Sequence, residues 1–193
     1  MKQDVFVKGA AHTSIIHDSA VKHVTGRADY TDDLAEPYGL LHAYLGLSQC
    51  AHGKITGMDF SETLAHPGVV GVLTAKDIPG VNDVSPNDKN DDPIFAEEEV
   101  LFWGQPIFAV IAETRDQARR AAHKARITYD VLPHALDPMA AKDAGMGYVT
   151  DPLTLRRGDA DAGMAAAPRR IKGRFNIGGQ DHFYLEGQIG RAH

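Results

Sequence analysis

One stretch in the second half of the chain constrains the fold most strongly, because three element signals follow one another without a gap. Residues 100–113, VLFWGQPIFAVIAE, predict a strand with a bulge or sheet edge at Pro106, which has no N–H to donate. Residues 114–125 predict a helix, since Thr114 suits the cap and alanines recur along one face. Residues 126–133 alternate as a second strand. This order predicts a βαβ-like crossover.

Earlier in the chain, shorter patterns predict strands and turns. Residues 40–48 are mostly apolar and predict a strand, and we expect the polar, glycine-broken residues 52–60 to pair with it after a turn. Ser61 is the expected N-cap of a short helix, and the valine-rich residues 69–74 predict a buried strand. The polar, acidic residues 82–93 predict a loop. Together with the crossover, these elements indicate a mixed α+β fold.

The last third of the chain changes in character. Asp137 and Pro138 begin a short predicted helix that ends before Gly145. A second short helix, capped by Asp159, follows within a polar segment, and a strand is expected from Ile171. We therefore divide the chain into an N-terminal arm (1–17), an α+β domain (18–147), a linker with a short helix (148–169) and the start of a further domain (170–193).

Composition excludes several classes of protein. The chain has 193 residues, 43% hydrophobic and 24% charged, which is typical of a globular protein. Its net charge of −6, with scattered Lys and Arg, argues against nucleic-acid binding. The single cysteine, Cys50, excludes an internal disulfide and a multi-cysteine metal site. No apolar run of about 20 residues exists to span a membrane, and the first residues do not resemble a secretory signal, so the expected location is cytoplasmic.

The segment GGQDHFYLE, residues 178–186, carries the candidate site. Its two glycines permit a close backbone approach. On a strand, alternation would place Gln180, His182 and Glu186 on one polar face, together with Tyr184. These three residues are the candidates for binding a cofactor, and the alternative is a half-exposed strand without a functional role.

A metal site made by this chain alone finds little support in the sequence. The ten histidines show no metal-ligand spacing. Asp88, Asn90 and Asp92 resemble the start of a calcium loop, but Pro93 stands where the sharp turn requires glycine. We therefore expect a solvated acidic loop and no catalytic or structural metal here.

Several motifs, in order along the chain, resemble one known family. They are GRADYTDDL, HGKITGMDFSETLAHPGVVGVLTAKDIPG, GQPIFAVIAETRDQARRAAHKARITYDVLP and IGGQDHFYLEGQ. From about residue 18 onward the chain is similar to the aldehyde oxidase and xanthine dehydrogenase family of molybdenum hydroxylases, especially to molybdopterin-binding subunits of the xanthine dehydrogenase type. The resemblance implies an α/β hammerhead domain, followed by the first strand of the molybdopterin-binding domain.

The resemblance also implies a function for the whole enzyme. Such enzymes hydroxylate a purine carbon, hypoxanthine or xanthine, with water as the oxygen source. Molybdopterin is then bound by the full subunit, with 2Fe–2S centres and FAD on a partner subunit. The catalytic residues of the family have no counterparts here, and GQIGRAH at the end departs from the family pattern, so we expect a truncated or frameshifted chain. Alone, it is expected to be inactive and to bind no molybdopterin.

A second hypothesis for the function of the chain is that it acts without the rest of an enzyme. It could be a stand-alone interaction or assembly module that docks on an iron–sulfur/FAD subunit or a cofactor chaperone. The strand expected from Ile171 would expose unpaired backbone groups, so it favours a homo-oligomer or strand exchange. A third hypothesis is a small metal-binding protein. The sequence does not separate xanthine from aldehydes or other heterocycles as the substrate.

Overall fold

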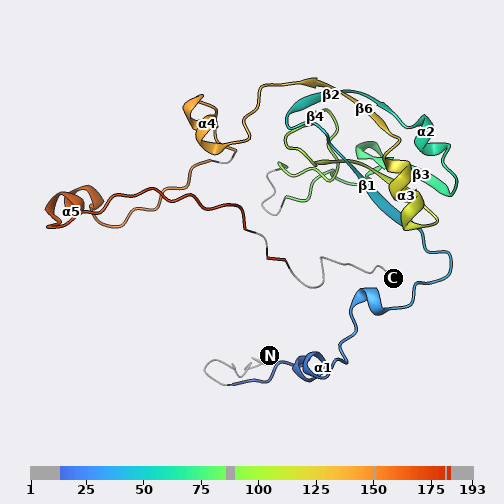
Figure 1. Cartoon of the computed structure of the whole chain (residues 1–193), viewed down its shortest axis with the longest axis horizontal. Coiled ribbons are helices and arrows are strands. Elements are labelled where there is room, and N and C mark those ends of the chain that lie inside the picture. The colour runs from blue at the N-terminus through green and yellow to red at the C-terminus, as the bar shows by residue number, and fades with distance from the viewer. Residues whose placement is uncertain (1–13, 86–89, 150, 181, 184–193) are drawn as a thin grey trace, which may run out of the picture. The chain divides into compact units, whose positions relative to one another are not determined.

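The computed structural model describes residues 14–85, 90–149, 151–180, 182 and 183 (Figure 1). The chain divides into two units, one formed by Tyr38–Arg170 and one by its terminal segments, residues 1–37 and 171–193. The first unit contains every strand of the described part of the chain. The fold of that unit is mixed α and β, as predicted.

One sheet is built around a central strand. β5 (Pro106–Ala112) lies between β1 (His42–Leu47) and β3 (Val69–Thr74), and both neighbours run antiparallel to it. The sequence of the central strand is an apolar run because both of its faces are covered. The register shifts between Gly46 and Leu47, where Leu47 pairs with Pro106, so the predicted bulge at this proline is confirmed.

The second sheet corrects two of our predictions. β2 (Gly53–Asp59) lies between β4 (Glu99–Val100) and β6 (Arg126–Val131). The strand at 52–60 therefore exists, but its predicted pairing with residues 40–48 is wrong. The predicted crossover is also wrong, because β5 and β6 belong to different sheets.

A backbone contact explains why the chain leaves the first sheet after β1. Ser48 donates its N–H to the carbonyl oxygen of Gln105 at 2.8 Å, which holds residue 48 to the segment before β5. The turn at 49–52 then carries the chain into the second sheet, where Gly53 pairs with Val131. A hairpin between β1 and β2 would break both contacts.

α3 (Arg115–Ala122) confirms the helix prediction. The Thr114 side chain accepts a hydrogen bond from the N–H of Gln117, as an N-cap does. The buried face of the helix consists of alanines (Ala118, Ala121 and Ala122), and the helix packs on β1 and β5. Small residues let the helix approach the sheet closely.

α2 (Ser61–Leu64) is short, and its N-terminus differs from the prediction. Ser61 is its first residue rather than its cap, and its N–H donates to the Asp59 carboxylate at 2.9 Å. Thr63 is fully buried and donates its hydroxyl to the carbonyl oxygen of Ala121 at 3.1 Å, which joins α2 to α3. The hydroxyl is thereby satisfied within the core.

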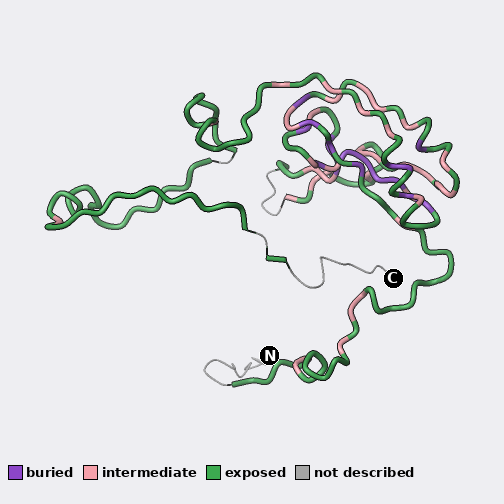
Figure 2. Tube along the Cα trace, in the orientation of Figure 1, coloured by how far each residue is buried: buried purple, intermediate pink, exposed green. Residues whose placement is uncertain are grey.

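The core lies on the two sheets and α3, where Figure 2 shows most of the buried residues. Ile107, Val110 and Val100 are fully buried, and the rings of Phe60 and Phe108 meet edge to face at 4.9 Å. β3 was predicted to be buried, but its residues are half-buried or exposed. β3 lies at the edge of its sheet, and its Val70 and Leu73 side chains remain 61% and 43% exposed.

The remaining elements are short and carry no buried residue. They are α1 (Ala20–Val24), η1 (Thr31–Asp33), η2 (Ala75–Asp77), α4 (Pro138–Asp143) and α5 (Ala160–Ala166). Asp137 and Asp159 cap α4 and α5, as predicted. Residues 171–180, 182 and 183 form no regular secondary structure, so the strand expected from Ile171 is absent from them. A strand needs a hydrogen-bonded neighbour, and neither sheet of the described part of the chain includes residues 171–180.

Candidate functional site

Two of the three residues predicted to bind a cofactor lie among the described residues. Gln180 and His182 are exposed and lie in a segment without regular secondary structure. The Gln180 amide donates locally, to the carbonyl oxygens of Gly178 at 3.3 Å and Gly179 at 3.5 Å. Glu186 lies outside the described residues. The role of these three residues therefore stays a prediction.

A buried polar cluster, which the sequence analysis missed, shapes the segment between β4 and β5. Ser48 is 1% exposed and Gln105 is 2% exposed. The Ser48 hydroxyl donates to the carbonyl oxygen of Phe102 at 2.8 Å and accepts from the N–H of Gly104 at 3.0 Å. The Gln105 amide oxygen accepts from the N–H of Leu101 at 2.7 Å. These bonds fix the loop conformation from both sides.

The loop held in this way exposes three consecutive large apolar side chains. Leu101 is 57% exposed, Phe102 52% and Trp103 66%. Gly104, at φ +88°, supplies the left-handed residue that turns the loop back into β5. We call Leu101, Phe102 and Trp103 the apolar tip. A contiguous apolar surface on a fixed loop is typical of a contact surface rather than of a catalytic centre.

A groove of about 390 Å³ lies next to the apolar tip. Its lining includes Trp103, Leu47, Tyr44, His123 and Tyr129, and the Tyr44 and His123 rings lie 6.1 Å apart. Burial raises the pKa of the Tyr129 hydroxyl above its ordinary value. The groove therefore combines aromatic and aliphatic surface with the polar groups of Ser48 and Gln49, which suits a partner side chain that is apolar with a polar end.

A second cavity, of about 410 Å³, lies between β2 and η2. Met58 and Phe60 supply apolar surface, while Thr74, Lys76 and Glu97 supply polar groups. The lysine is the single cation in its lining. This lining contains no arrangement of nucleophile and base that would indicate a reaction.

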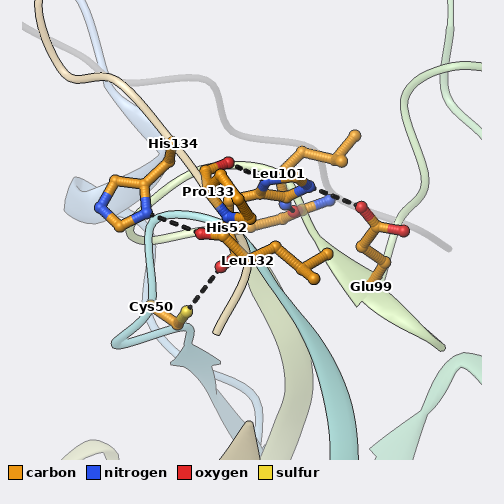
Figure 3. A network of polar contacts seen from close by, with 8 residues as sticks. Cys50, His52, Glu99, Leu101, Leu132, Pro133 and His134 are labelled. Atoms are coloured by element: carbon orange, nitrogen blue, oxygen red, sulfur yellow. Dashed lines mark hydrogen bonds and ion pairs between the residues drawn. The ribbon is translucent and has the colours of Figure 1, made fainter. Parts of the chain in front are cut away.

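A third group of polar contacts joins the three strands of the β2 sheet at one end (Figure 3). The His52 ring lies with Nδ1 2.8 Å from the carbonyl oxygen of Pro133 and Nε2 2.7 Å from the Glu99 carboxylate. The Pro133 carbonyl, and then Glu99, raise the pKa of His52 above its ordinary value of 6.5, while desolvation acts in the opposite direction. Sequence patterns gave no signal for this cluster, because its members are 47 and 81 positions apart.

Neither cavity fits a molybdopterin. Its phosphate group requires several N–H donors or cations, whereas one cavity offers a single lysine and the lining of the other contains no lysine or arginine. Within the described residues, no group of three or more His, Cys, Asp or Glu side chains could hold a metal ion. We therefore derive no chemical step through this cofactor from the described part of the chain.

Comparison with known proteins identifies the domain. The family described as aldehyde oxidase and xanthine dehydrogenase, a/b hammerhead domain, matches residues 25–133. A xanthine dehydrogenase of Oryza sativa is 39% identical over 176 residues, and aldehyde oxidase 2 of Rattus norvegicus is 37% identical over 174 residues. Each alignment covers 90% of this chain and 13% of the relative.

Solved structures agree with this match. The aldehyde oxidoreductase of Desulfovibrio gigas superposes with a TM-score of 0.60 at 34% identity, over 68% of this chain and 16% of that one. The chain belongs to the aldehyde oxidase and xanthine dehydrogenase family, and it contains the α/β hammerhead domain of that family. It spans about 13% of the length of the curated relatives it matches. No helix in the part of the chain that the structure describes could cross a membrane.

Proposed function

We propose that this chain supplies the hammerhead domain of a cytoplasmic molybdenum hydroxylase of the xanthine dehydrogenase type, which oxidises hypoxanthine or xanthine in purine catabolism. The similarity to xanthine dehydrogenase over 90% of the chain is the observation that carries the proposal. The proposed assembly holds molybdopterin in a domain that starts near residue 170, and 2Fe–2S centres and FAD on a partner subunit. The arm, the hammerhead domain and the linker would then be residues 1–17, 18–147 and 148–169.

In this proposal the chain positions other parts of the enzyme rather than performing the chemistry. Its described residues form a rigid two-sheet core and present the apolar tip. The cofactor supplies the hydroxylation chemistry, and the protein supplies its binding and orientation. Gln180, His182 and Glu186 are the proposed contacts to the cofactor region.

The proposal is tested by unfolding the domain in the source organism. Val110 is fully buried in β5, so Val110→Asp places an unpaired charge in the core and unfolds the domain. The matched control is Val149→Asp, because Val149 is 103% exposed. Oxidation of xanthine and of an aromatic aldehyde is measured in extracts with a dye as the electron acceptor.

We expect Val110→Asp to abolish xanthine oxidation and the control to retain it. If both variants oxidise xanthine at the wild-type rate, the chain is not part of that enzyme. If aldehyde oxidation is lost while xanthine oxidation is retained, the assignment to the family stands and the substrate is an aldehyde.

The apolar tip favours a second candidate function, docking of this chain on an iron–sulfur/FAD subunit. Trp103 is exposed although the loop that carries it is fixed, which is typical of an interface anchor. Trp103→Ser should weaken co-purification with that subunit, and Val149→Ser should not. The homo-oligomer expected from the C-terminal segment is tested separately by sedimentation velocity. A single monomeric species at all concentrations would contradict it.

A further inference from the structure

The hydrogen bonding of the His52 ring depends on its protonation state. Nδ1 faces a backbone carbonyl oxygen, that of Pro133, and Nε2 faces the carboxylate of Glu99 (Figure 3). A carbonyl and an ionised carboxylate only accept hydrogen bonds, so both ring nitrogens must donate. Only the imidazolium carries two N–H groups. The neutral ring can satisfy one of these partners and leaves the other without its donor.

These two bonds close the end of the β2 sheet. β4 is two residues long, and Glu99 is one of them, so the side-chain bond to His52 supplements a very short ladder. On the other side, the ladder with β6 ends at Val131, and the N–H of Leu132 then donates to the carbonyl oxygen of His52 at 3.0 Å. The hydrogen bond from the His52 ring to the Pro133 carbonyl continues the contact between the two segments by one residue beyond Leu132.

We propose that His52 is a proton-dependent clasp that holds the exit of β6, at Leu132–His134, to β4. When the ring is protonated, it bridges Pro133 and Glu99 and the exit is fixed. When the ring loses its proton, one of the two bonds is lost and the exit segment becomes more mobile. This inference concerns the domain itself and does not depend on the substrate of the enzyme.

Other charged groups near the ring are compatible with this role. The titratable and charged side chains on the elements packed around His52 are Lys54 on β2, Glu98 and Glu99 around β4, Asp130 on β6, and Cys50 and His134 in the flanking segments. The Cys50 thiol donates to the carbonyl oxygen of His52 at 3.2 Å, and His134 Nδ1 donates to that of Leu132 at 3.0 Å. Both groups therefore engage the backbone rather than the ring.

The direction of the pH effect follows from the two bonds. The Pro133 carbonyl and the Glu99 carboxylate raise the pKa of His52 in the folded chain above its unfolded value of about 6.5. The stabilisation is then fully present below that unfolded value and is lost as pH rises through the folded pKa. The ring is 30% exposed and Glu99 is 40% exposed, so solvent weakens the effect without removing it.

The clasp is tested by nuclear magnetic resonance on the whole chain. The imidazole Cε1–H signal of His52 is followed between about pH 5 and pH 9, together with the hydrogen-exchange protection of the Leu132 amide, which donates to the carbonyl oxygen of His52. We expect His52 to titrate at a higher pH in the folded chain than in urea, and the Leu132 amide to lose protection several-fold with the same midpoint. Titration at or below the unfolded pKa would refute the clasp.

Two variants separate the clasp from a merely structural role. Glu99→Gln keeps the shape but offers a neutral amide that can donate to Nε2, so a neutral ring satisfies both partners. We expect protection of the Leu132 amide to become independent of pH in this variant. The control is His66→Gln, because His66 contacts the carbonyl oxygen of its own neighbour Pro67. If Glu99→Gln retains the wild-type pH dependence, or if His66→Gln removes it, the proposal is wrong.

Discussion

A pair of glycines in the β5 sheet gives the sharpest test of the core packing. Gly46 lies opposite Phe108 in the β1–β5 ladder, and a Cβ at position 46 would overlap the Phe108 ring. The ring is 2% exposed and packs edge to face on Phe60, so it has little room to move. At Gly71, on β3 of the same sheet, a Cβ would meet no atom within 4 Å. Both backbones are compatible with alanine.

Gly46→Ala and Gly71→Ala should therefore change stability in opposite directions. Overpacking a filled core costs about 1–3 kcal/mol, while replacing glycine by alanine stabilises by roughly 0.4–1 kcal/mol through the unfolded chain. Taking the middle of each range, the balance is a loss of about 1.3 kcal/mol for Gly46→Ala. Gly71→Ala should gain roughly 0.4–1 kcal/mol, because no clash offsets the gain.

Urea unfolding followed by far-ultraviolet circular dichroism measures both effects. With a slope of about 2 kcal/mol per molar urea, the midpoint should fall by about 0.5–1 M for Gly46→Ala and rise by about 0.2–0.5 M for Gly71→Ala. Phe108→Leu in the Gly46→Ala background should reduce the penalty, since the clash is with the ring. Equal midpoints for the two alanine variants would refute the packing described here.

Four further predictions concern single side chains. Thr114→Ala removes the cap of α3 and should destabilise the domain by about 1 kcal/mol in the same urea assay. Asp159→Ala should leave the midpoint unchanged, because α5 has no buried residue. Ser48→Ala should cost about 1–2 kcal/mol, since the buried hydroxyl bonds to Phe102 and Gly104 are lost; a change below about 0.3 kcal/mol would contradict the role of the cluster. Cys50 is 6% exposed, so a thiol-reactive dye should label it only along the urea transition.

Elements that depend on neighbouring residues were predictable from the sequence. Thr114, Asp137 and Asp159 cap their helices as expected, because an N-cap needs only a side-chain oxygen and the N–H groups two or three residues later. The apolar run that became β5 was equally clear, because a central strand is buried on both faces. These signals lie within one element and need no knowledge of the partner strand.

Strand pairing was not predictable, because distant contacts decide it. β1 and β2 follow each other after a turn, which favours a hairpin, but the backbone of Ser48 binds Gln105 instead. The helix between β5 and β6 favoured a crossover within one sheet. In the structure it leads from one sheet to the other, since β6 alternates half-buried and exposed residues and pairs with β2. The sequence pattern within one element reveals neither the Ser48–Gln105 contact nor the pairing of β2 with β6.

The polar clusters, like the strand pairing, depend on contacts between distant residues that the sequence does not reveal. Gln180 and His182 stand out in the sequence because polar and aromatic residues are dense there, yet both are exposed and lie in a segment without regular secondary structure. His52 and Glu99 lie in unremarked polar segments, and the pairing of β2 with β4 brings them within 2.7 Å. A histidine pattern predicts chemistry only when its neighbours are known, because the acceptors facing its two nitrogens decide whether it holds a proton. In this domain the sheet topology supplies those acceptors.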